Sequence, residues 1–293
     1  MPTILKATTV KAEVKGFYAL GALNTSSLIR RQYVVADPAT KRCALVDPVL
    51  DFDEKSGTTG TMSADAILSY VAAKDLTVQW ILDTHPHADH LFAAHYLRRR
   101  TGAPTAIGAR VVDMQRLWKG IYNWNSLATD GSQWDRLFAH GESFEVGSIP
   151  ARVLFSPGHT PASITYLIGD ATFVNDTLFM PDGGTARADF PGVNAEALWV
   201  SIQDILALPP ETRVFTGHDY RPGGREPRWE STVGEQMQSN IHLAGADADA
   251  FIRRRATRDR TLPMPKLMPG DTRIGGHRTG SPYEPGGVMP SHL

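Results

Sequence analysis

The chain has a single cysteine, no long apolar run and almost no excess of charge of either sign. Cys43 is the only cysteine among 293 residues, so an intramolecular disulfide is excluded. Its neighbours, Arg42-Cys43-Ala44-Leu45-Val46, are typical of a strand, which predicts a small buried side chain rather than a reactive thiol. No stretch approaches the roughly 18 apolar residues that a membrane helix requires.

The charge balance also argues against a polymeric partner. Thirty Lys and Arg residues offset 31 Asp and Glu residues, for a net charge of −1. Such a chain has no long-range field that would attract nucleic acid or a membrane surface. The first 15 residues lack the apolar core of a secretory signal, so the cytoplasm is the expected compartment.

Hydrophobic periodicity predicts strands and helices that alternate through most of the chain. Strands are expected at 28–29, 33–35, 43–46, 77–82, 105–108, 151–155, 163–168, 171–175 and 213–216. Helices are expected from 63 onward and at 91–100, 112–118, 195–208, 232–243 and 246–259. Six prolines after residue 261 exclude long regular structure there. We therefore expect one domain over 1–245, followed by a helix and a Pro/Gly-rich extension over 246–293.

The most informative segment is a histidine-rich loop that follows the predicted strand 77–82. Its sequence is Thr84-His85-Pro86-His87-Ala88-Asp89-His90, and it holds three of the ten histidines of the chain. Imidazoles and a carboxylate on one tight loop are ligands that suit zinc or ferrous iron. A solvated polar turn is the alternative, but this pattern is much more specific than a histidine pair.

This loop resembles the signature loop of the metallo-β-lactamase superfamily. The remaining ligand-type residues of that superfamily follow in the same order: His159 in Pro-Gly-His-Thr, Asp176 at the end of a strand, and His218 after Thr-Gly. The resemblance implies an α/β fold of the αββα type, in which two mixed β-sheets pack face to face with helices outside. It also implies a metal site at one edge of the sandwich.

Two further segments narrow the resemblance. Residues 175–192 read NDTLFMPDGGTARADFPG and residues 217–225 read GHDYRPGGR. Both resemble the persulfide dioxygenases, in particular their bacterial β-lactamase hydrolase-like branch. Members of that family oxidise glutathione persulfide with O₂ to sulfite and glutathione on a single non-haem ferrous ion. The chain is therefore expected to be an oxidoreductase with Fe²⁺ as its cofactor, one ion per subunit.

The resemblance assigns the iron ligands to His85, His159 and Asp176. Two imidazoles and one carboxylate would leave coordination positions open, as iron that activates oxygen requires. The other ligand-type residues are expected to surround the ion and hydrogen-bond its ligands or, in two-metal hydrolases, to bind a second metal; these are His87, Asp89, His90 and His218. The sequence leaves both roles open.

Glutathione carries two carboxylates, so its site needs guanidinium or other fixed donors. The expected substrate-binding residues are Arg187, Tyr220 and Arg225, although exposed surface residues are an alternative for each. Asp189 is expected to pair with a neighbouring base. The tryptophans at 118, 124 and 134 are expected to pack in the core rather than form a lid, and the basic run 253–260 to be a solvated helix face.

Two competing functions remain. One is a dinuclear zinc thiolesterase of the glyoxalase II type, with two Zn²⁺ in place of iron. The other is a non-catalytic metal-binding scaffold, which would not need an open metal site. Ser163 stands where many relatives carry cysteine, which argues against a redox role for that position. A homodimer is compatible with the sequence but is not specified by it.

Overall fold

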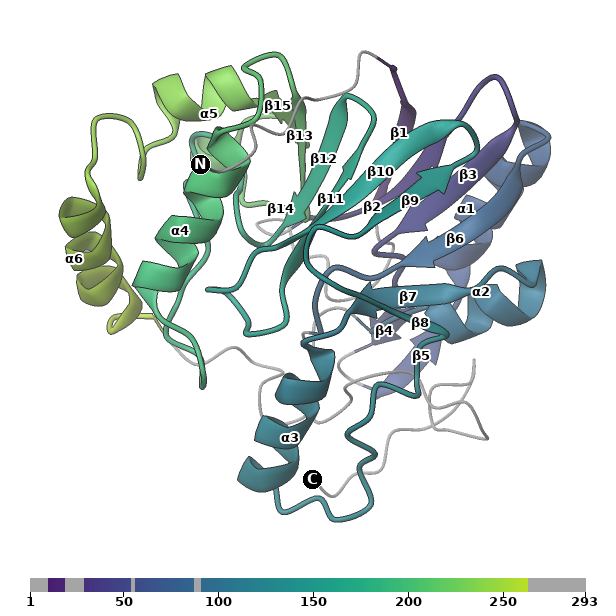
Figure 1. Ribbon diagram of the computed structural model, residues 1–293, viewed down its shortest axis with the longest axis horizontal. Helices are drawn as coiled ribbons and strands as arrows, with labels where there is room; N and C mark the ends of the chain where they lie inside the picture. The colour runs from purple at the N-terminus through teal and green to yellow at the C-terminus, as the bar shows by residue number, and fades with distance from the viewer. Residues whose placement is uncertain (1–9, 19–28, 54–55, 87–90, 263–293) are drawn as a thin grey trace.

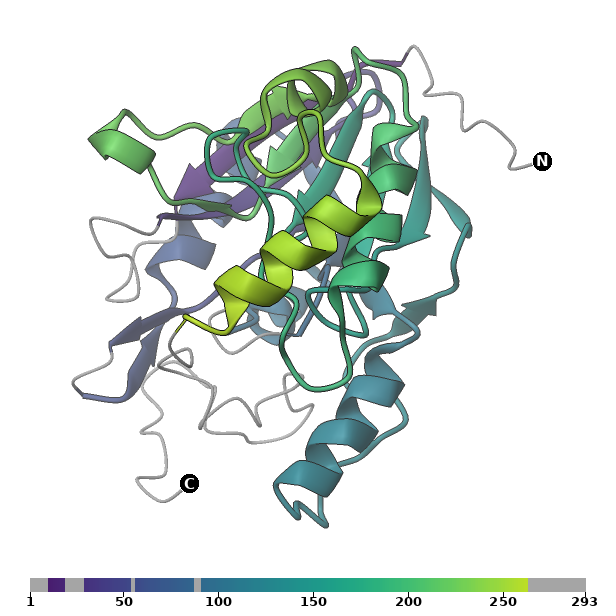
Figure 2. The same ribbon diagram turned by 90° about the vertical axis from the view of Figure 1, so that its left-hand side faces the viewer.

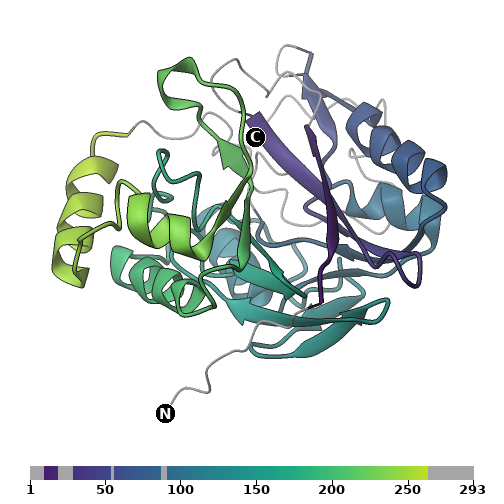
Figure 3. The ribbon, with the colours of Figure 1, turned by 90° about the horizontal axis from the view of Figure 1, so that it is seen from above.

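The computed structural model describes residues 10–18, 29–53, 56–86 and 91–262. Two β-sheets pack face to face, and helices lie on the outer side of each sheet (Figure 1 and, from above, Figure 3). This is the αββα architecture expected from the sequence, and the fold class is confirmed. None of the helices within the described ranges is both long and apolar enough to span a lipid bilayer.

The first sheet has the order β1-β2-β3-β6-β7-β8, with β14 paired to β2. Strands β3, β6, β7 and β8 run parallel, whereas β1, β2 and β14 are joined by antiparallel pairing. The strands are β1 (Glu13–Tyr18), β2 (Ile29–Ala36), β3 (Arg42–Val46), β6 (Thr77–Leu82), β7 (Thr105–Gly108), β8 (Arg136–Phe138) and β14 (His218–Asp219).

The second sheet has the order β15-β13-β12-β11-β10-β9, and only its β12–β13 pair is parallel. Its strands are β9 (Ser143–Val146), β10 (Ile149–Phe155), β11 (Ile164–Ile168), β12 (Ala171–Asn175), β13 (Arg213–Thr216) and β15 (Glu230–Thr232). A small separate hairpin is formed by β4 (Asp51–Asp53) and β5 (Thr58–Gly60).

The helices divide between the two outer faces. Helices α1 (Met62–Ala73) and α2 (Ala94–Thr101) share an apolar cluster with the first sheet. On the second sheet lie α4 (Ala195–Leu206), α5 (Val233–Ser239) and α6 (Ala248–Asp259), which share another cluster. Helix α3 (Val111–Ile121) follows β7, and a short 3₁₀ helix, η1, spans Pro222–Gly224.

The central core fills the space between the sheets. Along β2, Tyr33 and Val35 face this core, whereas Val34 faces the helices on the other side. Alternate residues of a strand point to opposite faces, so a sheet that is covered on both sides is apolar at nearly every position. The rings of Phe173 and Phe215 stack in this core with centroids 5.1 Å apart. The sandwich thus holds the ends of its strands in fixed positions.

Most predicted elements are confirmed, and the differences have local causes. Helix α2 begins at Ala94 rather than at residue 91, and α5 ends at Ser239 rather than at 243. Several short strands were not predicted from the sequence, among them β1, whose residues are all partly or fully exposed and therefore lack a strong apolar signal. Cys43 is buried, and burial raises its thiol pKa to about 12, as expected for a core residue.

Two side-chain predictions have different outcomes. Trp118 and Trp134 are buried in one apolar cluster with α3, which confirms that they are packing residues. The basic run 253–260 is not uniformly solvated, because Arg255 is buried and donates hydrogen bonds to the carbonyls of Thr185 and Ala186. The prediction of a solvated face was wrong at this position: the sequence does not reveal which distant carbonyls meet the helix.

Candidate metal centre

Four ligand-type residues lie at the carboxyl ends of strands, on one edge of the sandwich. His85 follows β6, and His159 follows β10. Asp176 directly follows β12, while His218 begins β14 just after β13. The strands that deliver His159, Asp176 and His218 run in the same direction within the second sheet. The fold therefore brings together residues that are up to 133 positions apart (85 to 218).

The three histidine side chains converge on the carboxylate of Asp176. Its Oδ2 lies 3.7 Å from His85 Nε2, 3.5 Å from His159 Nε2 and 3.3 Å from His218 Nε2. One ligand atom from each of His85, His159 and Asp176 lies within 4.8 Å of the others, and all three residues are buried. This is the spacing of a group that can share one ion.

The electrostatics of the cluster suit a cation. Burial alone would raise the pKa of Asp176, but His218, His159 and His85 together outweigh it and hold the pKa well below its usual range. Asp176 is therefore a carboxylate at neutral pH. A buried carboxylate that faces imidazole nitrogens is a donor set for zinc or ferrous iron. The residues present thus fit a metal of that class.

Two hydrogen bonds orient the imidazole rings. His159 Nδ1 lies 3.1 Å from the carbonyl oxygen of Arg187, so it must carry the proton and donate to that oxygen. His85 Nδ1 lies 3.2 Å from the hydroxyl of Thr84. When Nδ1 of a histidine carries the proton, its Nε2 has the lone pair that a metal needs. The structure in this way turns Nε2 of His159 toward Asp176.

Comparison with known proteins agrees with this geometry. Residues 28–218 match the family model of the metallo-β-lactamase superfamily. The chain belongs to that superfamily. It is 68% identical over 237 residues to the "Beta-lactamase hydrolase-like protein" of Agrobacterium fabrum, an alignment that covers 81% of this chain and 55% of the relative. The chain thus spans about half the length of the curated β-lactamase hydrolase-like relatives that it matches.

Two other similarities cover most of both partners. The "Glyoxylase B2" of Dictyostelium discoideum is 45% identical over 241 residues, which are 81% of this chain and 82% of the relative. The crystal structure of ETHE1 from Myxococcus xanthus has a TM-score of 0.67 and 31% identity, and covers 88% of this chain and 96% of its own. The predicted superfamily is confirmed. The His and Asp residues described above form a metal-binding site of this superfamily fold.

One residue that supports the superfamily site was missed by the sequence analysis. Asp47 follows β3, and its carboxylate accepts hydrogen bonds from the Thr84 backbone N–H (2.8 Å), the Thr84 hydroxyl (3.0 Å) and the Asn175 side-chain amide (2.6 Å). Burial raises the pKa of Asp47 to about 6. The hydrogen bonds to Asp47 fix Thr84 and Asn175, which directly precede His85 and Asp176. The available signal was its place at the end of an apolar strand, like the other site residues.

His87, Asp89 and His90 lie outside the described residues. His218 is within them and joins the cluster through its 3.3 Å approach to Asp176. The close packing there explains Gly217, because a Cβ on this residue would lie 2.0 Å from the Asn175 amide oxygen.

Arg187 lies one aromatic ring away from the cluster. Its guanidinium donates to both carboxylate oxygens of Asp189, at 2.6 and 2.7 Å, as expected for Asp189. The guanidinium also lies 5.0 Å from the centroid of the Phe190 ring, which in turn packs edge-on against His159 at 5.4 Å. A cation is therefore held close to the metal site, with its orientation fixed by a carboxylate.

Tyr220 lies at the rim of the site. The residue is 46% exposed, so it is accessible from solution. The ring packs edge-on against Phe179 with centroids 5.0 Å apart and lies 6.2 Å from His218. Tyr220 therefore lies beside a residue of the cluster and at the surface.

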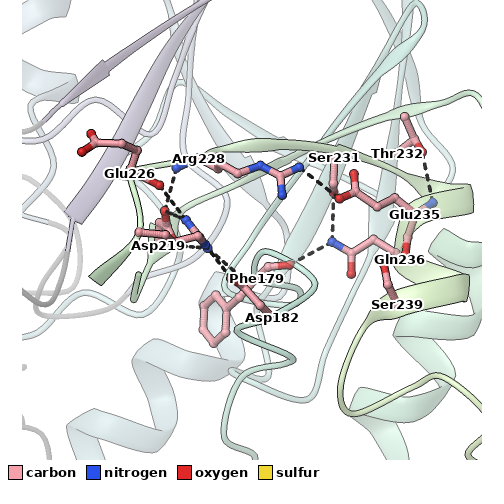
Figure 4. A network of polar contacts seen from close by, with 11 residues as sticks. Phe179, Asp182, Asp219, Glu226, Arg228, Ser231, Thr232, Glu235, Gln236 and Ser239 are labelled. Carbon is pink, nitrogen blue, oxygen red and sulfur yellow. Dashed lines mark hydrogen bonds and ion pairs between the residues drawn. The ribbon is translucent and has the colours of Figure 1, made fainter. Parts of the chain in front are cut away.

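Arg225 ties together the loops that follow Asp176 and His218. Its guanidinium donates to both oxygens of Asp182 (2.5 and 2.7 Å) and to both oxygens of Asp219 (2.7 and 2.8 Å). Asp219 also accepts the backbone N–H of Arg228 at 2.7 Å (Figure 4). Hydrogen bonds to Asp182 and Asp219 raise the pKa of Arg225 above its ordinary value. Bidentate pairs of this kind fix both partners.

A buried histidine, His242, contacts the loop that carries Arg187 and should make the stability of the protein depend on pH. His242 Nδ1 accepts the Thr185 N–H at 2.9 Å, so the ring is neutral, and burial together with Arg255, Arg258 and Arg254 lowers its pKa to about 3. Below its unfolded pKa of about 6.5, the unfolded state binds more protons than the folded one. The metal-free protein should thus lose stability as pH falls, by about 1–2 kcal/mol from this residue between pH 7 and 5.

The substitution His242→Asn removes this titration and keeps an acceptor oxygen close to the position of Nδ1. Its loss of stability between the two pH values should be smaller by that amount. Denaturant unfolding of both metal-free proteins at each pH measures the difference. Equal losses in the two proteins would show that His242 does not contribute to the pH dependence.

Proposed function

We propose that the chain is a non-haem iron dioxygenase that oxidises glutathione persulfide with O₂ to sulfite and glutathione. The observation that carries the proposal is that His85 Nε2, His159 Nε2 and an Asp176 oxygen lie close enough together to hold one ion. It is supported by the motifs at 175–192 and 217–225, and by the similarity to ETHE1 along most of both chains.

His85, His159 and Asp176 would hold one ferrous ion per subunit. Such an ion would supply the one-electron chemistry that allows O₂ to react with a spin-paired substrate, while leaving positions open for small molecules. Asp176 contributes the negative charge that favours a cation in a buried site. The Arg187 carbonyl and the Thr84 hydroxyl orient the two imidazoles. His218, with His87, Asp89 and His90, would hydrogen-bond the groups around the ion.

Arg187 and Tyr220 are proposed to bind the glutathione part of the substrate. Arg187 is aimed by Asp189 and lies next to Phe190, which touches His159. A carboxylate bound there would place the sulfur end of the molecule toward the metal ligands. Arg225 was expected to bind substrate as well. Because its guanidinium already donates to Asp182 and Asp219, we propose that it holds the loop that carries Tyr220.

A second candidate is a dinuclear zinc thiolesterase of the glyoxalase II type. Two observations favour it: His218 Nε2 lies only 3.3 Å from Asp176 Oδ2, so this carboxylate could be shared between two ions, and a relative at 45% identity is named "Glyoxylase B2". Two zinc ions would supply a hydroxide at neutral pH. The two candidates thus differ in the metal, its stoichiometry and the bond that is broken.

The deciding experiment combines metal quantification with two assays. Protein loaded anaerobically with Fe²⁺ is added to glutathione persulfide in an oxygen electrode, and sulfite is measured in the same sample. We expect one iron per chain and O₂ uptake matched by an equal amount of sulfite. Zinc-loaded protein is tested in parallel for hydrolysis of a glutathione thioester. No O₂ uptake by the iron-loaded protein, together with thioester hydrolysis at two zinc ions per chain, would reject the dioxygenase.

A further inference from the structure

The segment that carries Arg187 is hydrogen-bonded to α6, the last helix within the described residues. Arg255 of α6 donates through Nη1 to the carbonyl oxygens of Thr185 (2.9 Å) and Ala186 (2.5 Å). One turn later, Asp259 accepts the backbone N–H of Ala188 at 2.9 Å. The helix thus contacts the backbone on both sides of Arg187. We call residues 184–188 the Arg187 loop.

The two α6 side chains act as a unit. Arg255 Nη1 lies 3.8 Å from Asp259 Oδ1, and both residues are buried. Burial lowers the pKa of Arg255 to about 10, so the guanidinium is still charged at neutral pH. Its charge is offset by Asp259 and by the two loop carbonyls. A buried charge requires such partners, so the position of the loop relative to α6 is narrowly defined.

Apolar packing also holds this helix in place. Phe251 of α6 is fully buried in the cluster that α4 forms with the second sheet, and Ile252 packs against the same cluster. Figure 2 shows α6 beside α4 on the outer side of the molecule. Apolar packing thus holds α6 against α4, while Arg255 and Asp259 connect α6 to the Arg187 loop.

The Arg187 loop in turn orients His159. The carbonyl oxygen of Arg187 lies between the two anchored positions and accepts the His159 Nδ1–H at 3.1 Å. We propose that Arg255 and Asp259 are positioning residues for the metal centre: they fix the Arg187 carbonyl and, through it, the direction in which His159 Nε2 points. This inference rests on the proposed role of His159 as a metal ligand, but not on the identity of the metal or the reaction.

The test measures metal binding instead of turnover. Co²⁺ is titrated into the metal-free protein, and its affinity and visible spectrum are recorded for the wild type and for Asp259→Ala. We expect an affinity about 10-fold weaker, at the low end of what loss of an outer partner costs, and a changed spectrum because the ligand geometry changes. Asp259→Asn keeps an acceptor oxygen and should recover most of both. Arg253→Ala, an exposed residue of the same helix, is the matched control and should leave both unchanged.

A second comparison separates positioning from a merely structural role. In a His159→Ala background the bond to the Arg187 carbonyl is absent, so adding Asp259→Ala should weaken Co²⁺ binding no further. The proposal is overturned if Asp259→Ala lowers the stability of the metal-free protein but leaves Co²⁺ affinity and spectrum as in the wild type. If Asp259→Ala does not fold, Arg255→Lys replaces it, because a lysine keeps the charge but lacks the planar guanidinium.

The outcome can be told apart from a failure of the proposed function. If His159→Ala itself has no effect on Co²⁺ binding, the ligand assignment fails and the positioning role fails with it. If the Co²⁺ results are as expected but the iron-loaded protein takes up no O₂, only the dioxygenase proposal is rejected.

Discussion

Asp176→Ala is expected to lose both its metal and its turnover. Asp176 is the carboxylate on which His85, His159 and His218 converge, so its removal takes away one proposed ligand together with its negative charge. Loss of an outer partner alone costs about 10–100-fold in metal affinity, so loss of the central carboxylate should cost more than about 100-fold. After anaerobic loading and gel filtration, the variant should retain almost no iron and show no measurable O₂ uptake.

The matched control for this variant is Asp204→Ala. Asp204 is an exposed aspartate on α4, and its substitution should leave both metal content and turnover unchanged. Circular dichroism of the two variants verifies that both are folded. If Asp176→Ala retained its full complement of metal, the assignment of the ligands would be wrong, and the ion would have to be held by other residues of the cluster.

Arg225→Met is expected to give the largest loss of stability among surface-accessible charges near the site. The substitution leaves Asp219 buried, 1% exposed, without the guanidinium that offsets its charge. Removing one partner of a buried ion pair costs about 3–5 kcal/mol. We expect a value of about 3 kcal/mol, because Asp219 keeps the backbone N–H groups of Arg228 and Arg221. Urea unfolding of the metal-free protein measures this loss.

A neighbouring arginine gives the control for this measurement. Arg228 pairs through its side chain with Glu235 at 3.0 Å, and about half of the arginine side chain is exposed (Figure 4). Exposed ion pairs contribute about 0–1 kcal/mol, so Arg228→Met should lower the free energy of unfolding by no more than about 1 kcal/mol. The backbone hydrogen bond from residue 228 to Asp219 remains in this variant. Similar losses in the two variants would mean that the Arg225 pairs add no more to stability than an exposed pair does.

The residues of the candidate site could be predicted from the sequence, because they lie in short, recognisable motifs. The histidine-rich loop is conspicuous by its composition, whereas His159, Asp176 and His218 were predicted because their motifs and order resemble those of the metallo-β-lactamase superfamily. The fold then brings these strand ends to one edge, since β10, β12 and β13 run in the same direction. The resemblance thus predicted which residues would lie together, and the strand order explains how the fold brings them to one edge.

The residues that support the site could not be found in the same way. Asp47 is a lone aspartate in the sequence, and its importance appears only when Thr84 and Asn175 come from two other strands to meet it. For Arg225 and Arg255, the sequence indicates a cation but not its partner. Whether such a cation is solvated, binds a ligand or is paired internally depends on which distant carboxylates and carbonyls the fold places beside it.

The four converging side chains come from both halves of the sandwich. His85 follows a strand of the first sheet and His218 pairs with β2 of that sheet, whereas His159 and Asp176 extend from the second. An ion bound by these side chains would connect the two sheets. Because a ligand that binds only the folded state stabilises it, a chelator would then weaken the cohesion of the whole sandwich as well as stop its reaction.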